Sequence, residues 1–371
     1  MKVHGIVLLV VFSLLSGCTE TKINTSHKDA LVVQGRWVTE QDGQVMGDPQ
    51  TSGLIKWRGN LLTLSDRSAH ASQRLRLRKI EQASGRLQPG DMPMKLSERV
   101  ASGCFAAYLS GNPDLEALAV DPDDDRVFYV ATEDASSATL SEACQQQFAH
   151  SGSTHYPSLL IRLVLQADNS LTISHVRPIQ FSADMHIGDF PNDGLEALTF
   201  GTGRSLYLGL EKDSRDQARI FSLKIDAAFW QNIDFAPVRE VKLRLPKFDQ
   251  GNHPINGMAY YQHQGAGYLI AAARNDESLW IIDLAAQKDT RIVPLKFDAP
   301  IIPGDTSCGE WERMDNASIE GVAVDGSTLW LINDPWKLVY AKNIQCELNR
   351  TKFENMAPLI FSLPIQDQWF N

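Results

Sequence analysis

Short apolar runs separated by turns recur along most of this chain. Five segments open with a similar phrase and continue through an apolar run, a turn rich in Gly, Asp or Asn, and a second apolar run. The five phrases are Thr51-Ser-Gly-Leu54, Leu115-Glu-Ala-Leu118, Leu195-Glu-Ala-Leu198, Ile255-Asn-Gly-Met258 and Ile319-Glu-Gly-Val322. Two apolar runs joined by such a turn are typical of a β-hairpin. The pattern therefore indicates an internal repeat of five β-units.

A third and a fourth apolar run follow most of the hairpins. The third runs are residues 74–80, 158–165, 219–225, 278–284 and 358–364, and the fourth runs are 93–97, 171–181, 238–245 and 291–297. The fifth unit lacks a fourth run, whereas residues 30–38 precede the first unit and belong to no other. Repeated four-stranded units are typical of β-propeller blades.

We therefore predict an all-β, five-bladed β-propeller over residues 30–371. The N-terminal strand would complete the last blade, which removes the free edges of the ring. Residues 134–157 leave room for a sixth blade as an alternative. Their content of Ser, Gln and Ala favours an insertion loop instead.

Polar residues recur in register within the five units. A first column, at the start of each first strand, contains Ser52, Glu116, Glu196, Asn256 and Glu320. A second column, at the end of each second strand, contains Asp66, Glu133, Glu211, Asn275 and Asp334. A third column in the entry loops, Asp48, Asn112, Asn192, Asn252 and Asn316, is better explained by turn capping. Because a hairpin reverses direction, the first two columns should share one face of the propeller.

These two columns predict an acidic, oxygen-rich mouth of the central channel. Converging carboxylates need protons, donors or a cation, and oxygen ligands suit calcium better than zinc. Glu116, Glu196, Glu320 and Asp334 are the candidate metal ligands. Further ligand-binding candidates are Ser52, Asn256, Glu133, Asn275, Arg67 and Lys212. Asp66 and Glu211 are the candidate catalytic carboxylates, whereas the alternative is that each acid only ties its blade to the next.

Other side chains near the predicted mouth have more ordinary explanations. Arg274 and Lys337 could offset the acids or hold an anionic ligand, but surface ion pairing is the simpler interpretation. Lone histidines such as His70 and His186 are usually not catalytic. Trp336 could stack on a ligand or pack against a blade edge.

The N-terminus indicates an exported lipoprotein. Residues 1–17 combine Lys2 with a short apolar run, which fits a signal peptide and is too short to span a bilayer. Leu15-Ser-Gly-Cys18 resembles a bacterial lipobox, which implies lipidation of Cys18 and membrane attachment through it. Thr19, in place of an aspartate, favours the outer membrane facing the periplasm. Residues 18–29 are polar and predict a tether.

The remaining four cysteines predict two disulfides. Cys104 and Cys308 each lie twelve residues before a first-column glutamate, and Cys144 and Cys346 follow the second strands of the same two units. Export permits disulfides. We predict the pairs Cys104–Cys144 and Cys308–Cys346.

Charge and motifs exclude several functions. The formal net charge of −10 argues against nucleic-acid binding. The chain contains no GxSxG, HExxH or P-loop motif. Any catalysis would therefore depend on carboxylates and a metal ion.

Three segments resemble a known family. TSGLIKWRGNLLTLSDRS, DGLEALTFGTGRSLYLGLEKD and SIEGVAVDGSTLWLINDP are similar to units of the phytase-like propellers, the "esterase-like activity of phytase" family, and to the related SdiA-regulated lipoprotein-like propellers. The resemblance covers residues 50–340. It implies an exported propeller with calcium binding and phosphoesterase or esterase activity. The positions of this chain that match the family's functional residues are Ser52, Asp66, Glu116, Glu196, Glu211, Glu320 and Asp334. Asn256 departs from it, since an acid is usual there.

The sequence thus supports two functional hypotheses. One is a calcium-dependent hydrolase of a phosphoester or ester at the acidic mouth. The other is a non-catalytic propeller that binds a ligand or another envelope protein.

Overall fold

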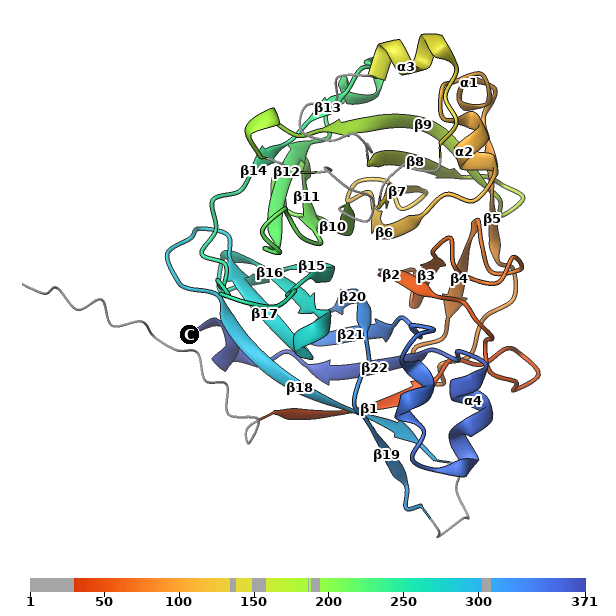
Figure 1. Ribbon diagram of the computed structural model, residues 1–371, viewed down its shortest axis with the longest axis vertical. Coiled ribbons are helices and arrows are strands. Elements are labelled where there is room, and N and C mark those ends of the chain that lie inside the picture. The colour runs from red at the N-terminus through yellow and green to blue at the C-terminus, as the bar shows by residue number, and fades with distance from the viewer. Residues whose placement is uncertain (1–29, 134–137, 149–157, 186, 188–193, 302–307) are drawn as a thin grey trace, which may run out of the picture.

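The protein is described by a computed structural model that covers residues 30–133, 138–148, 158–185, 187, 194–301 and 308–371 (Figure 1). The predicted signal peptide and tether, Cys18, His186 and Asn192 lie outside these residues. Strands dominate, and their antiparallel ladders form groups of four strands around a common centre. The predicted all-β propeller fold is therefore confirmed.

The first two groups pair through their outer strands. The first contains β2 (Thr51–Trp57), β3 (Asn60–Ser65), β4 (Arg76–Ile80) and β5 (Met92–Leu96). The second contains β6 (Leu115–Val120), β7 (Val127–Thr132), β8 (Leu159–Leu165) and β9 (Leu171–Gln180). Outer strands β5 and β9 run parallel to each other.

The other three groups follow the same order. The third contains β10 (Leu195–Phe200), β11 (Ser205–Leu210), β12 (Arg219–Lys224) and β14 (Arg239–Glu240). The fourth contains β15 (Ile255–His263), β16 (Ala266–Ala273), β17 (Ser278–Asp283) and β18 (Arg291–Pro300). The fifth contains β20 (Ile319–Asp325), β21 (Thr328–Asn333), β22 (Leu359–Pro364) and the N-terminal β1 (Leu31–Trp37).

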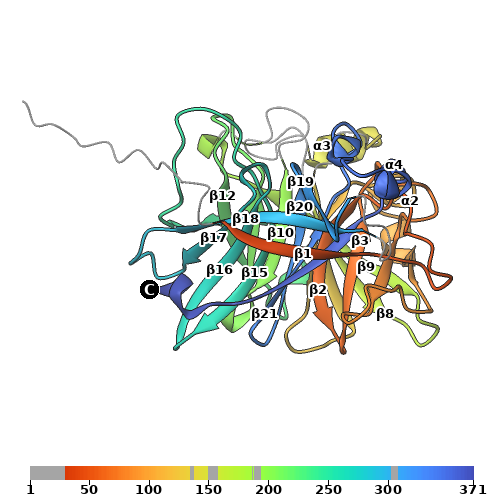
Figure 2. The same ribbon diagram turned by 90° about the horizontal axis from the view of Figure 1, so that it is seen from below.

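The N-terminal strand closes the last group as the sequence predicts. Strand β1 is antiparallel to β22, with Gly35 opposite Phe361, and parallel to β18, with Val33 opposite Phe297. Figure 2 shows β1 lying beside β18 on the outside of the molecule. The chain thus joins its first strand to its last sheet, which leaves neither outer edge open.

The five innermost strands enclose the central axis. Contacts run from β2 to β6, β6 to β10, β10 to β15, β15 to β20 and β20 back to β2. These inner strands lie so close together that some of their positions require glycine. A Cβ on Gly257 would lie 2.5 Å from the backbone oxygen of Glu320 on the neighbouring strand. Apolar residues such as Leu54, Leu118 and Met258 fill the axis and line a further cavity of about 250 Å³ at its other end.

One segment differs from the sequence prediction, and a second, predicted as an insertion loop, contains a helix. The fourth strand expected over residues 238–245 is only the two-residue β14, because Val241, Leu243 and Leu245 pack instead against the core of the fourth group. Residues 134–157 contain helix α3 (Glu142–Phe148) in their described part, where the six-blade alternative requires strands.

The remaining elements are short and peripheral. They are the helices α1 (Glu98–Ala101), α2 (Ala106–Ser110) and α4 (Arg350–Glu354), and the strands β13 (Ala236–Pro237) and β19 (Trp311–Met314). In the described part of the chain, none of the helices has the length and apolar character needed to cross a bilayer.

Both predicted disulfides are present. Cys104 pairs with Cys144 and Cys308 with Cys346, at Cα–Cα distances of 5.6 and 5.8 Å. Cys104–Cys144 joins the loop that enters the second group to helix α3. Cys308–Cys346 joins the loop before β19 to the loop that follows β21.

Candidate functional site

A polar cavity of about 260 Å³ lies at the end of the central axis where the inner strands begin. Eight carboxylates line it: Asp66, Asp114, Glu116, Glu133, Glu196, Glu211, Glu320 and Asp334. The only cationic lining residues are Arg67 and Arg274, and Gln50, Ser68 and Trp336 complete the described wall. The structure thus brings most of the two predicted columns together on one face.

Each first-column residue occupies a β-bulge. Leu115 pairs with Thr132 and Ala117 with Ala131, so Glu116 is an extra residue without a partner in the ladder. The same register shift places Ser52, Glu196, Asn256 and Glu320 at the corresponding bulges. Bulges change the direction of a side chain and are frequent beside functional sites. Repetition of the bulge explains how glutamates at the start of buried strands reach a polar cavity.

The second column begins directly after the second strands. Glu133, Glu211 and Asp334 donate their backbone N–H groups to Asp114, Gly194 and Ser318, each two residues before a bulge residue. The distances are 3.1, 3.0 and 2.8 Å. This repeated bond holds the end of the second strand beside the start of the first, so that both columns reach the cavity.

The prediction that Asn275 belongs to the second column is wrong. In the fourth group Ile255 pairs with Ala273, so the residue equivalent to Glu133 and Glu211 is Arg274. Asn275 is exposed, and its side chain donates to the carbonyl of Asn252 at 3.0 Å. Matching the repeats by polarity places Asn275 in the second column, whereas strand pairing places Arg274 there, one residue earlier.

Arg274 is therefore the cation of the second column. Its guanidinium forms an ion pair with Glu320 and lies 3.4 Å from Glu211. It also lies 5.8 Å from the centre of the Trp336 ring, within range of a cation–π contact. Although burial by itself lowers the pKa of Arg274, the Glu320, Glu196 and Glu211 carboxylates together raise it. The guanidinium remains charged and neutralises one side of the cavity.

Sequence analysis missed Asp114. This residue is 3% exposed, lies two positions before Glu116, and pairs with Arg67 at 2.9 Å. The repeat could have identified it, because positions 50, 114 and 318 precede equivalent bulge residues by the same spacing.

We call the carboxylates around the axial cavity the ring. Their burial raises the pKa of several of them. Burial, together with Glu196 and Asp114, raises the pKa of Glu116 well above its usual range. Burial, with Glu133 and Glu211, does the same to the pKa of Glu196. Burial outweighs Arg274 and raises the pKa of Glu320 to about 7. Without a further cation, part of the ring is therefore protonated near neutral pH.

Asp66 and Asp334, two acids of the second column, differ in their surroundings. Asp66 accepts hydrogen bonds from the backbone N–H groups of Ser68 at 2.5 Å and Ala69 at 3.1 Å. Burial nevertheless raises the pKa of Asp66 to about 6. Burial and the nearby Glu320 raise the pKa of Asp334 well above its usual range. Oδ1 of Asp334 is buried and has no hydrogen-bond partner among the described residues.

The donor set fits a hard divalent cation. In three triads, one oxygen from each residue lies within 4.8 Å of the others: Glu116, Glu196 and Glu320; Asp114, Glu116 and Glu133; and Glu133, Glu196 and Glu211. Two oxygens bound to one calcium ion can be at most roughly 5 Å apart, twice the usual calcium–oxygen distance. No triad contains His or Cys, the usual ligands of zinc. The buried Oδ1 of Asp334, which has no hydrogen-bond partner among the described residues, would also suit a cation.

The other predicted ligand-binding residues lie beside the cavity. Asn256 is fully buried, and its amide nitrogen lies 3.4 Å from Glu196. Ser52 is buried at its own bulge, and its Oγ has no hydrogen-bond partner in the described part of the chain. Lys212 is half-buried and contributes positive charge near Glu211. His70 is exposed and its ring contacts Ser72, away from the cavity.

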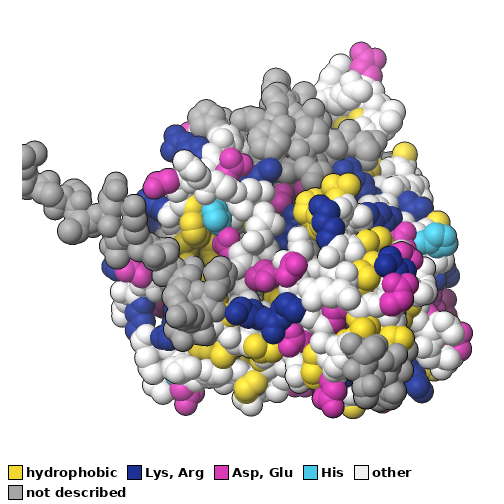
Figure 3. All heavy atoms as spheres, turned by 60° about the horizontal axis from the view of Figure 1, so that its bottom comes forward, with side chains coloured by type: hydrophobic (Ala, Val, Ile, Leu, Met, Phe, Trp, Pro, Cys, Tyr) yellow, Lys and Arg dark blue, Asp and Glu magenta, His cyan; other side chains and the backbone are white. Residues whose placement is uncertain are grey.

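On the face shown in Figure 3, basic and acidic side chains are interspersed rather than gathered by sign.

Comparison with solved structures finds distant likenesses only. The chain resembles the allergen Mala s 1 of Malassezia sympodialis, with 10% identity, a TM-score of 0.44, and 86% of this chain and 94% of that chain covered. It also resembles a GH43_1 enzyme from Xanthomonas citri, with 10% identity, a TM-score of 0.42, and 89% of this chain and 90% of that chain covered. A third likeness is to Trypanosoma rangeli sialidase in complex with 2,3-difluorosialic acid, with 10% identity, a TM-score of 0.40, and 88% of this chain and 56% of that chain covered.

No family model and no curated protein matches the chain. Likenesses this distant carry no functional argument, so the class rests on strand pairing and on the site. Those features define a β-propeller with an acidic cavity at one end of its axis.

Proposed function

We propose that this chain is a calcium-dependent hydrolase of a phosphoester or ester, anchored in the bacterial cell envelope. One observation carries the proposal: eight carboxylates and only two guanidinium groups line one small cavity among the described residues. Such an excess of negative charge requires protons or a cation. Three overlapping oxygen triads supply suitable ligands.

The roles follow from position. Glu116, Glu196 and Glu320 would hold the ion, with Asp334 as a further ligand through its free Oδ1. A bound calcium ion would supply positive charge that attracts and polarises the oxygens of an ester.

The remaining polar groups would act on the substrate itself. Asp66 is the best-placed acid–base group, because its pKa of about 6 lies close to neutral pH. Arg67 and Arg274 offer guanidinium groups on the cavity wall that could contact an anionic oxygen. Glu211 is the weaker catalytic candidate, since Arg274 lies against it.

The anchor is proposed from the sequence. Cys18 in Leu15-Ser-Gly-Cys18 would carry the lipid and hold the propeller at the outer membrane, on the periplasmic side. The two disulfides agree with an oxidising compartment. Similarity of the repeat phrases to the phytase-like propellers supports both the envelope location and the reaction class.

Arg274 favours a second candidate function. Its guanidinium already bridges Glu211 and Glu320, so the chain neutralises part of its own ring. A ring neutralised in this way could serve a non-catalytic propeller that binds a small ligand or an envelope protein on the same face.

Calcium binding and turnover can be tested separately. The chain without residues 1–18 is the appropriate sample, because its strand pairing closes within residues 30–371. Calcium should raise its melting temperature, and Glu196→Gln should reduce this effect. Absence of any calcium effect in the unaltered chain would eliminate the metal site.

Hydrolysis of p-nitrophenyl phosphate and p-nitrophenyl acetate should require calcium and fall in Glu196→Gln. Exposed Glu347→Gln is the matched control, since Glu347 pairs only with Arg350 at the surface. Calcium binding without turnover would favour the non-catalytic alternative.

A further inference from the structure

A second binding region lies on the outside of the second group of strands, away from the axial cavity. Two adjoining pockets share Arg99 of α1 and lie against the outer strand β9. We call the two pockets together the outer groove. One, which we call the apolar pocket, is lined mostly by apolar side chains and measures about 320 Å³, and the other, which we call the polar pocket, is lined by charged side chains as well as apolar ones and measures about 610 Å³.

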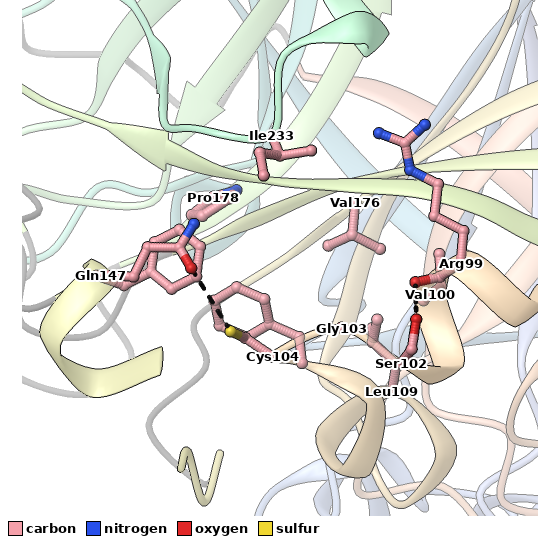
Figure 4. A pocket seen from close by; sticks show the side chains of 12 residues that line it. Arg99, Val100, Ser102, Gly103, Cys104, Leu109, Gln147, Val176, Pro178 and Ile233 are labelled. Atoms are coloured by element: carbon pink, nitrogen blue, oxygen red, sulfur yellow. Dashed lines mark hydrogen bonds between the residues drawn. The ribbon is translucent and has the colours of Figure 1, made fainter. Parts of the chain in front are cut away.

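The apolar pocket is walled by four elements (Figure 4). Val100, Phe105 and Leu109 come from α1, α2 and the turn between them, and Phe148 comes from α3. Val176 and Pro178 of β9 and the loop residue Ile233 close it. Disulfide Cys104–Cys144 fixes α3 against the α1–α2 segment, so this wall is covalently braced.

Three arginines and two aspartates, Asp121 and Asp226, line the described wall of the polar pocket, so its cationic side chains outnumber its carboxylates. Arg99 and Arg162 line it, and neither forms an ion pair within 4.0 Å among the described residues. Arg162 donates only to the hydroxyl of Ser174, at 3.1 Å. Arg204 in the same pocket differs, because it is neutralised by Asp121 at 2.7 Å.

Arg162 lies opposite His175 in the pairing of β8 with β9, and Arg99 lines the same pocket, so both guanidinium groups lie near His175. After burial, Arg99 and Arg162 are the groups that lower the pKa of His175. The His175 ring also lies 5.5 Å from that of Trp230, which in turn stacks on Tyr129 at 6.0 Å. The cationic region is therefore backed by an aromatic wall. His175 is adjacent in β9 to Val176, which lines the apolar pocket.

Among the described residues, no strand pairs with the outer edge of β9 between its two outer partners. Strand β5 pairs as far as Ile173, and β13 begins at Ile179. Arg177 holds the loop that includes Ile233 beside this gap through bonds to the carbonyls of Phe229, Asp234 and Phe235, at 2.8, 2.9 and 2.6 Å. Because Arg99 lines both pockets, the cationic region adjoins the apolar pocket at this stretch of β9.

We propose that the outer groove binds an anionic amphiphile, whose oxyanion head lies between Arg99 and Arg162 and whose alkyl chain fills the apolar pocket. Charge complementarity selects the head, since guanidinium groups without carboxylate partners bind carboxylate and phosphate oxygens strongly. The apolar pocket selects the tail, because it is concave and lined by aliphatic and aromatic side chains.

Calorimetric titration of the chain lacking residues 1–18 with octanoate tests the proposal. Octanoate should bind, whereas acetate, with the head alone, and octanol, with the tail alone, should each bind at least about tenfold more weakly. Equal binding of acetate and octanoate would overturn the role of the apolar pocket. Equal binding of octanol would overturn the role of the arginines, and no binding of octanoate would overturn the whole proposal.

Substitutions of groove residues test their individual contacts with the ligand and should leave the fold intact. Arg99→Gln and Arg162→Gln should each weaken octanoate binding about tenfold, and Ile233→Asn should weaken octanoate but leave acetate unchanged. Arg215→Gln is the matched control, since Arg215 is exposed and lies outside the groove. An equal effect of Arg99→Gln and Arg215→Gln would contradict the proposal. Glu196→Gln should leave octanoate binding intact, which separates this groove from the axial site.

Discussion

Glu116, Glu196 and Glu320 owe their common position to one backbone irregularity. Each is the extra residue of a β-bulge at the start of an innermost strand. An extra residue turns a side chain away from the alternation of the strand. Single residues therefore determine which groups enter the axial cavity. The first group has Ser52 at its bulge but supplies Asp66, whereas the fourth group has Asn256 and Arg274 and supplies no acid from either column.

Arg274→Gln tests whether the cation of the fourth group neutralises the ring. The change leaves Glu211 and Glu320 buried without their cation, so we expect a loss of about 3–5 kcal/mol in the free energy of unfolding at pH 7 without calcium. Urea unfolding measures the loss. Arg244→Gln is the control, because the Arg244–Asp289 pair is exposed and such pairs contribute about 0–1 kcal/mol. Equal losses in the two variants would contradict the role given to Arg274.

Closure by β1 is the main feature at the scale of the element. Strand β1 fills the space between β22 and β18, and its removal would expose both edges. A chain that begins at residue 30 should therefore unfold cooperatively. A chain that begins at residue 39 should lose cooperative thermal unfolding and aggregate. Circular dichroism and size-exclusion chromatography measure the difference, and identical behaviour of the two chains would refute the closure.

Packing of the inner strands makes a second prediction at this scale. Gly257→Ala places a Cβ 2.5 Å from the backbone oxygen of Glu320, which cannot move without shifting β20. We expect a loss of about 1–3 kcal/mol in the free energy of unfolding. Gly47→Ala, whose Cβ would have its nearest contact at 3.9 Å, should cost much less. Chemical denaturation of both variants measures the effect, and equal stability would show that the inner strands can separate freely.

At the scale of the whole molecule, the acidic cavity couples stability to pH and to calcium. The raised pKa values of Glu116, Glu196, Glu320 and Asp334 mean that the folded state holds protons that the unfolded chain releases. Stability is therefore complete below the unfolded pKa of about 4.5 and falls as pH rises through the folded values. For Glu320, with a folded pKa of about 7, the loss is on the order of 3 kcal/mol by pH 8.

Calcium should oppose this loss of stability at higher pH. The melting temperature without calcium should fall from pH 5 to pH 8, and the increase caused by calcium should grow over the same range, since the ion replaces the released protons. Thermal unfolding in a pH series with calcium or a chelator measures both slopes. A calcium effect independent of pH would show that the ion binds elsewhere.

Much of the architecture was predictable because it depends on local pattern. Repeated apolar runs, turn residues and matched cysteine offsets are properties of the chain itself, and they placed the strands near 51–57, 115–120 and 319–325 within a residue or two. The shortened strand near residue 240 was not predictable. Packing of Val241 and Leu243 onto the neighbouring group decided it.

The sequence by itself determined the repeat, the order of the strands, the two disulfides and most of the acidic columns, because these follow from periodicity and spacing. Only the tertiary structure decided that Arg274 replaces Asn275, that Asp114 joins the ring, and that Arg99 and Arg162 share a groove with an apolar pocket. Strand register and the approach of distant segments set these contacts. A one-residue bulge or a neighbouring sheet changes them without changing the pattern along the chain.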